Sequence, residues 1–215
     1  MIAIPDKPYM TPDEYLAWEE KQELRYEYVD GVAYVRNDID GMTGGTLPHN
    51  DIALNLYSAL RSVVRRKGCR VNVADVKVHT SEDGAFFYPD LLVSCHPQDK
   101  TALKFVRHPC LIVEVLSPST ESYDRGAKFA HYRRLESLRE YVLISSDRVN
   151  VEIFRLNERH KWELTPYAAG ETVQFTSIEF ECPIELLYED VDLSPQDSAQ
   201  DSPQESSNAR TSSQQ

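Results

Sequence analysis

The fold is decided by residues 111–132, which read LIVEVLSPSTESYDRGAKFAHY. The run opens as a short apolar strand with Glu114 at its centre, and SPST then predicts a helix from about residue 121 to 135. An ionised carboxylate in such a strand costs several kcal/mol unless a basic group or a metal ion pairs with it. The strand alone is equally consistent with a metal ligand and with a structural ion pair to Arg133 or Arg134.

The predicted helix after Glu114 carries a basic group. Asp124 and Lys128 share one helical face, and the connecting loop is short, so this face can lie near the end of the strand. Lys128 is therefore the first candidate for a catalytic lysine, and Lys77, in the alternating segment CRVNVADVKVHT, is the second. Taken alone, the spacing of Asp124 and Lys128 is more typical of an exposed ion pair worth a few tenths of a kcal/mol.

A second carboxylate, Asp90, lies in the strand-like segment FFYPDLLVSC. If that strand pairs with the Glu114 strand, both carboxylates can point to one face, where they repel each other unless a cation lies between them. Mg²⁺ (or Mn²⁺) suits such a pair, because hard divalent ions bind carboxylates, waters and phosphate oxygens. Glu27 could add a ligand, and His49 could shuttle a proton or contact a phosphate. Each of these residues taken singly is also typical of a structural role.

The remaining pattern predicts a mixed sheet covered by helices, an α/β arrangement of the mixed α+β kind. Thr11 and Glu14 form a capping box, and Asp30-Gly31 predicts a two-residue hairpin turn. Residues 1–193 are expected to form one domain. Helices are predicted over residues 11–22, 49–67, 121–135 and from 183, and strands over residues 69–80, 86–95, 111–117, 140–146, 150–156 and 161–167.

The net charge of −12 disfavours general attraction to nucleic acid or to anionic membrane. Part of this charge lies in residues 194–215, a Ser-, Gln- and Asp-rich acidic tail that is expected to be disordered. The basic end of helix 49–67 can compensate the helix dipole, and it is also the best candidate for contacting phosphates. Its residues are Arg61, Arg65, Arg66 and Lys67.

The cysteines and the apolar runs favour a cytoplasmic protein. Four cysteines without a C-x-x-C pair suggest reduced, buried thiols. No apolar run approaches the length of a membrane span, and the first residues do not resemble a secretory signal. The cysteines are Cys69, Cys95, Cys110 and Cys182.

The order of several segments resembles the Uma family of restriction endonucleases, within the PD-(D/E)xK nuclease superfamily. The resemblance covers residues 8–190 and rests on YEYVDG, LPHNDIALNL, YPDLLV, IVEVLSPSTESYDRGAKFAHY and EYVLIS. It implies a restriction-endonuclease-like core, with a mixed central sheet between helices. It also implies that Asp90, in the Pro89-Asp90 pair, is a metal ligand and that Glu114 is the second ligand.

The same resemblance assigns the remaining site residues. Leu116 stands where the superfamily has its lysine, and Lys128 matches a lysine that has moved to the next helix. Glu27 matches an acidic residue on the early hairpin, and His49 matches a histidine near the start of the second helix. These residues are implied to be part of the catalytic site.

The resemblance implies a Mg²⁺-dependent endonuclease that hydrolyses phosphodiester bonds of DNA. A homodimer is expected from the reaction, because two related sites cut two strands most easily. Two alternatives stay open. Leu116 and the acidic charge favour a non-catalytic binding or assembly module that keeps the nuclease fold, and the residues also fit a hydrolase of RNA or of another phosphorylated substrate.

Overall fold

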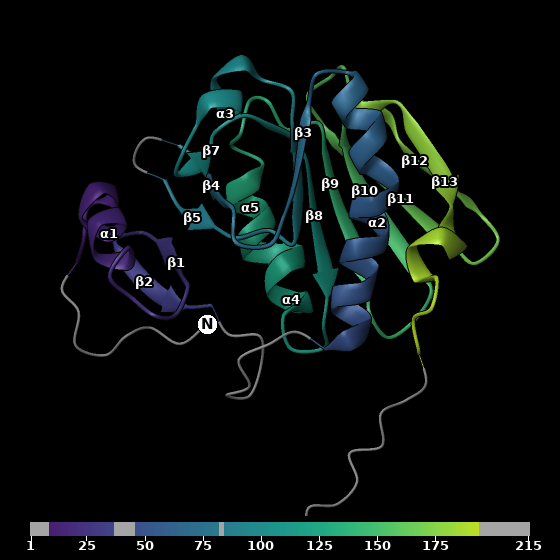
Figure 1. Ribbon diagram of the computed structural model, residues 1–215, viewed down its shortest axis with the longest axis horizontal. Coiled ribbons are helices and arrows are strands. Elements are labelled where there is room, and N and C mark those ends of the chain that lie inside the picture. The colour runs from purple at the N-terminus through teal and green to yellow at the C-terminus, as the bar shows by residue number, and fades with distance from the viewer. Residues whose placement is uncertain (1–8, 37–45, 82–83, 194–215) are drawn as a thin grey trace, which may run out of the picture.

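Six strands form the central sheet of the computed structural model, which describes residues 9–36, 46–81 and 84–193 (Figure 1). Their order across the sheet is β11-β10-β9-β8-β6-β3. The middle pair, β8 and β9, is parallel, and the other neighbouring pairs are antiparallel. The strands are β3 (Arg70–Val73), β6 (Leu91–Ser94), β8 (Pro109–Leu116), β9 (Glu140–Ser145), β10 (Asn150–Leu156) and β11 (Trp162–Ala168).

Helices cover both faces of this sheet, so the predicted mixed sheet between helices is confirmed. The long helix α2 (Leu47–Arg66) packs on one face, as its apolar spacing predicts (Figure 1). Along β8, Val113 joins the core under α2, whereas Ile112 and Leu116 join the core on the opposite face. Glu114 alternates with Val113 and therefore points to that opposite face. The helix there consists of α4 (Glu121–Tyr123), the π-helical η1 (Asp124–Lys128) and α5 (Phe129–Tyr132).

A second sheet packs against the α5 side of the central sheet, in the order β2-β1-β5-β4-β7 (Figure 1). Its first two strands form the predicted hairpin. Asp30 and Gly31 have φ values of 47° and 85°, the positive values that such a two-residue turn requires. The strands are β1 (Tyr26–Val29), β2 (Val32–Val35), β4 (Lys77–His79), β5 (Phe86–Phe87) and β7 (Phe105–Val106).

Shorter elements complete the fold. The capping box of Thr11 and Glu14 begins α1 as predicted, and the helix predicted from Pro183 is the 3₁₀ segment η3. The hairpin β12–β13 and η3 add apolar side chains to the core under α2. These elements are α1 (Pro12–Glu19), α3 (Pro97–Thr101), β12 (Thr172–Phe175), η2 (Thr176–Ile178), β13 (Phe180–Pro183) and η3 (Ile184–Tyr188).

Two segments that were predicted as single strands are each broken in two. Residues 69–80 break at Ala74 and Asp75, whose φ values of 45° and 39° end β3 and start the chain toward β4. Residues 86–95 break at Pro89 and Asp90, between β5 and β6. Both breaks carry the chain between the two sheets, and the second places Asp90 at their junction.

Two of the four cysteines are not the reduced thiols that were predicted. Cys69 and Cys95 form a disulfide, because they flank the paired ends of β3 and β6, where Arg70 is opposite Ser94. Cys110 and Cys182 are free; Cys182 is buried, and Cys110 is half-buried.

The structure bears on the prediction that the chain has no membrane span, but not on the prediction of a disordered tail. Within the described ranges, no helix combines the length and the apolar character needed to cross a membrane. Residues 194–215, predicted to be a disordered tail, lie outside the described residues, and the domain boundary at residue 193 stays a prediction.

Candidate active site

Glu114 is held by two groups from the helix that faces it. Lys128 Nζ lies 2.9 Å from Glu114 Oε1, and the Tyr132 hydroxyl donates to the same oxygen over 3.1 Å. Glu114 is only 3% exposed, and this burial raises its pKa well above the ordinary value, against the opposing charge of Lys128. The basic partner of Glu114 is therefore Lys128, and the predicted alternative of Arg133 or Arg134 is wrong, since both arginines are exposed.

Lys128 lies among three carboxylates. Besides Glu114, its Nζ is 3.3 Å from Asp124 Oδ1 and 3.6 Å from Glu27 Oε1. Burial favours the neutral amine, but the three negative charges outweigh it and raise the pKa of Lys128 well above the ordinary value. The lysine is therefore protonated. We call these four residues the Lys128 cluster.

The expectation of an exposed ion pair between Asp124 and Lys128 is wrong. Both side chains are buried, because η1 presents them to the sheet rather than to solvent. The i, i+4 spacing predicts that two side chains are neighbours, but it does not predict which way their shared face points. The π-helical turn that contains them is of a kind that occurs frequently at functional sites.

Glu27 reaches the Lys128 cluster from the second sheet. It lies on β1 and accepts a hydrogen bond from the Tyr88 amide over 3.5 Å. Burial raises its pKa, against the opposing charges of Lys128 and Arg36. The cluster therefore joins the two sheets, with Glu27 from one and Glu114 from the other.

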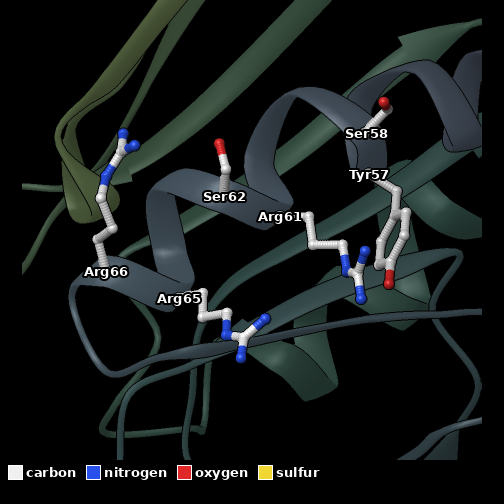
Figure 2. A pocket seen from close by; sticks show the side chains of 6 residues that line it. All are labelled: Tyr57, Ser58, Arg61, Ser62, Arg65 and Arg66. Carbon is white, nitrogen blue, oxygen red and sulfur yellow. The ribbon is translucent and has the colours of Figure 1, made fainter.

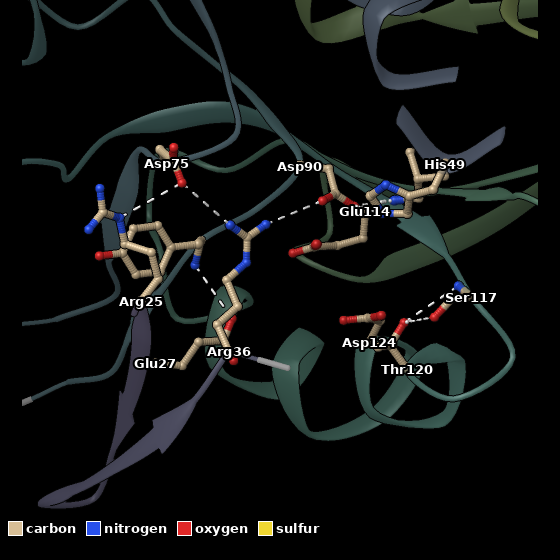
Figure 3. Close-up of polar contacts among 12 residues, drawn as sticks. Arg25, Glu27, Arg36, His49, Asp75, Asp90, Glu114, Ser117, Thr120 and Asp124 are labelled. Carbon is tan, nitrogen blue, oxygen red and sulfur yellow. Dashed lines mark hydrogen bonds and ion pairs between the residues drawn. The ribbon is translucent and has the colours of Figure 1, made fainter. Parts of the chain in front are cut away.

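Asp90 forms the second part of the site, beside Glu114 (Figure 3). Its Oδ2 accepts the Val115 amide over 2.7 Å and lies 3.1 Å from His49 Nε2, at the N-terminal turn of α2. Burial disfavours the ionised form of Asp90. The contacts with His49, the charge of Lys128 and the Val115 amide outweigh this cost and hold its pKa below the ordinary value. Asp90 in turn raises the pKa of Glu114, so the two carboxylates act on each other.

Arg36 also belongs to the site, and the sequence interpretation missed it. Its guanidinium lies between Asp90 and Asp75, with nitrogens 3.6 Å and 3.8 Å from one carboxylate oxygen of each (Figure 3). It also lies over the Tyr88 ring, 5.5 Å from the centroid. The signal for Arg36 was weak: it is a basic residue directly after a hairpin strand, and its partners are distant in the sequence.

Lys77, the second candidate for the catalytic lysine, belongs to a different ion pair. Its ammonium contacts Glu19 of α1, which also accepts the Tyr88 hydroxyl. Lys77 Nζ lies 5.8 Å from the centroid of the Tyr88 ring. Among the residues that the structure describes, Lys77 makes no ion pair with Asp90 or Glu114.

The donor set of the site fits Mg²⁺ or Mn²⁺. Three buried carboxyl groups share the single charge of Lys128, and burial raises the pKa of two of them, Glu114 and Glu27. A divalent cation would offset the negative charge of their ionised forms. In the described part of the chain, no three histidine, cysteine, aspartate or glutamate side chains converge as a ready metal site. Mg²⁺ commonly binds one or two carboxylates and completes its coordination shell with water and phosphate oxygens. The pair of Asp90 and Glu114 agrees with this preference.

Proteins similar to this chain include two relatives and one solved structure. An uncharacterized protein of Synechocystis, slr1290, is 34% identical over 181 residues, which are 84% of this chain and 92% of that protein. A second one, sll1609 of the same organism, is 29% identical over 167 residues, 77% of this chain and 91% of that protein. The fold matches a crystal structure from Anabaena variabilis, described as "a putative nuclease belonging to DUF820", with a TM-score of 0.66 and 19% identity over 84% of this chain and 98% of that one.

The family itself is identified from the sequence. A family model described as "Uma2: Putative restriction endonuclease" matches residues 12–185, most of the described chain. This match spans α1, both sheets and all residues of the site above. The chain therefore belongs to the Uma2 family of restriction-endonuclease-like proteins.

Proposed function

We propose that this chain is a Mg²⁺-dependent (or Mn²⁺-dependent) endonuclease that hydrolyses phosphodiester bonds of DNA. The observation that carries the proposal is the Lys128 cluster: three buried carboxylates around one ammonium, beside an ionised Asp90. A purely structural ion pair needs one carboxylate for one ammonium. The surplus of buried negative charge is explained if a divalent cation completes the site.

Asp90 and Glu114 are the residues that would hold the cation. When bound, such an ion lowers the pKa of a water ligand and polarises the phosphate. Val115 and His49 fix Asp90 through its Oδ2, and Tyr132 orients Glu114. These contacts hold both carboxylates in position before any substrate arrives.

Lys128 and Glu27 would act on the substrate and on the attacking water. The protonated Lys128 would offset the negative charge that grows on the phosphate oxygens. Burial raises the pKa of Glu27, which makes its carboxylate a stronger proton acceptor than an exposed one. Arg36 contacts the other carboxylate oxygen of Asp90, Oδ1, and can add a second positive charge near the phosphate.

A catalytically inactive binding module is the second candidate function. It is favoured by one observation: Lys128, Arg36 and His49 already pair with the carboxylates of the site. In that case these bases are permanent structural partners, and no cation enters. RNA or another phosphorylated substrate would use the same groups. A homodimer is part of the proposal, because cleavage of both DNA strands favours paired sites. The proposal of a cytoplasmic location rests on the short apolar runs alone, because the Cys69–Cys95 disulfide removes the argument from reduced cysteines.

A plasmid-nicking assay with Mg²⁺ or Mn²⁺ tests the proposal. Wild type is expected to nick, while Asp90→Asn and Lys128→Ala lose about a hundredfold to a thousandfold of the rate. Lys77→Ala is the matched control, because it removes a lysine that also pairs with a buried glutamate outside the site. Equal nicking by wild type and Asp90→Asn would refute the proposed site, and absence of nicking in all variants would favour the inactive module.

A further inference from the structure

A groove of about 670 Å³ lies along α2 and is lined by side chains of this helix (Figure 2). Helix α2 covers the face of the central sheet opposite the one that Glu114 faces. Three arginines and three hydroxyl-bearing side chains line the groove. All three arginines are exposed. We call it the arginine groove; its residues are Tyr57, Ser58, Arg61, Ser62, Arg65 and Arg66.

The three arginines are available for a ligand. In the described part of the chain, no ion pair joins Arg61, Arg65 or Arg66 to a carboxylate, whereas the adjacent Lys67 pairs with Glu179. Compensation of the helix dipole accounts for basic residues in the last turn, which are Arg65 and Arg66. Arg61 lies before that turn and needs another explanation.

The positive surface continues beyond α2. A Cβ on Gly68 would lie 3.5 Å from Lys100 Nζ, so the ammonium of α3 stands next to the end of α2. Arg70, at the start of β3, donates to the Lys100 carbonyl over 3.0 Å. Basic groups from three elements therefore gather at the C-terminal end of α2, although the net charge of the whole chain is −12. Such a local patch is typical of a surface that binds phosphates.

Helix α2 connects this surface to the site. His49, at the start of α2, contacts Asp90. Arg61 and Arg65 follow 12 and 16 residues later, which at the helical rise per residue is about 18 Å and about 24 Å along the axis. At the rise of B-form DNA, these lengths correspond to about five to seven base pairs.

We propose that Arg61 and Arg65 bind backbone phosphates of the DNA about five to seven base pairs from the bond that is cut. The inference rests on the proposed function, because the same duplex must lie in the Asp90 site. The hydroxyls of Ser58, Ser62 and Tyr57 can donate to phosphate oxygens between the arginines. These contacts set affinity and register and do not take part in the chemistry.

Self-association through α2 is the competing explanation. The first half of the helix has two exposed apolar residues, Leu47 at 76% and Leu54 at 44%. The arginine groove lies toward the other end of the helix, where the lining side chains carry three guanidinium groups and three hydroxyl groups. This composition favours a polyanion over an apolar helix face.

Fluorescence anisotropy with a labelled 24-base-pair duplex and a labelled 6-base-pair duplex, both in EDTA, tests the inference at several salt concentrations. R61A/R65A is expected to bind the long duplex about tenfold or more weakly, with the slope of log affinity against log salt reduced by about 2. The short duplex spans about 20 Å and cannot reach both arginines from the cut bond, so its binding is expected to change less than that of the long duplex. The matched control is R159A/K161A, two exposed basic residues at the turn between β10 and β11.

Cleavage of bis-p-nitrophenyl phosphate with Mn²⁺ separates this inference from the proposed function. R61A/R65A is expected to cleave this small diester like wild type, whereas Asp90→Asn is inactive. If R61A/R65A binds the long duplex with unchanged affinity and salt slope while Asp90→Asn is inactive, the inference is wrong and the proposed function stands. If duplex binding depends on Arg61 and Arg65 but wild type cleaves nothing, the proposed function is wrong and the groove remains a binding surface. If wild type is a dimer, R61A/R65A is a monomer, and duplex binding per chain is unchanged, the groove serves self-association and the inference is wrong.

Discussion

The Lys128 cluster and the arginine groove use positive charge in opposite ways. Lys128 is 6% exposed and lies within 3.6 Å of three carboxylates, whereas Arg61 and Arg65 are exposed and form no ion pair among the described residues. A buried charge must be compensated by other groups of the fold, whereas an exposed charge is solvated by water until a ligand binds. The two regions therefore differ in what a substitution costs. Stability depends on the cluster, and duplex affinity is expected to depend on the groove.

Removal of one positive charge from each region is expected to give the largest contrast in the free energy of unfolding. Lys128→Met leaves Glu27, Glu114 and Asp124 buried without their shared ammonium, so the free energy of unfolding is expected to fall by about 3–5 kcal/mol. Arg61→Met, on the exposed face of α2, is expected to change it by less than about 0.5 kcal/mol. Urea unfolding followed by circular dichroism measures both. Equal losses in the two variants would remove the distinction between the regions.

His79 is a second buried basic residue to compare with Lys128, and among the described residues neither of its ring nitrogens has a hydrogen-bond partner. It stacks on Phe86, with the ring centroids 4.1 Å apart. Burial, with a smaller contribution from the charge of Arg107, lowers its pKa from 6.5 to about 4. Between these two pH values the unfolded chain binds a proton that the folded chain does not, so stability falls as the pH drops through this window.

The loss should amount to on the order of 3 kcal/mol between pH 7 and pH 4. His79→Phe removes this contribution and is expected to flatten that part of the stability profile, measured by urea unfolding at several pH values. Carboxylates titrate in both proteins over the same pH range, so the difference between the two stability curves is the informative quantity. Parallel curves for wild type and His79→Phe would contradict the account of His79.

Glu114→Gln gives the smallest expected change in stability among the substitutions of buried residues considered, and it separates a metal ligand from a structural ion pair. The raised pKa of Glu114 means that its charge is unfavourable in the metal-free protein. An uncharged glutamine of the same shape is therefore expected to stabilise the metal-free chain by about 1 kcal/mol or to leave it unchanged. Thermal unfolding in EDTA measures this. A loss of several kcal/mol would instead identify Glu114 as one half of an obligatory ion pair with Lys128.

The sequence predicted the elements whose signals are local. Short apolar runs predicted β8 and β9, and Asp30-Gly31 predicted the hairpin turn that places Glu27. Family resemblance and helical spacing together named Lys128. The mixed sheet between helices followed from the order of these elements.

Most of the features that were missed depend on contacts between distant segments. The apolar alternation changes phase at residues 74–75, from Val71 and Val73 to Val76 and Val78, and the prediction of a single strand overlooked this weak local signal of the change of sheet. Arg36 and the Cys69–Cys95 disulfide depend on strand pairing, which residue spacing does not reveal. Asp124 was expected at the surface because spacing within a helix does not report which side the sheet covers.

Titration calorimetry with Mn²⁺ is the most direct test of the central claim, that the buried pair of Asp90 and Glu114 holds a divalent cation beside Lys128. Wild type is expected to bind one ion per chain, and Asp90→Asn and Glu114→Gln are expected to lose this binding. Glu19→Gln, which alters a buried glutamate paired with Lys77 outside the site, should bind like wild type. Wild type that binds no Mn²⁺, or Glu114→Gln that binds it with wild-type affinity, would contradict the claim.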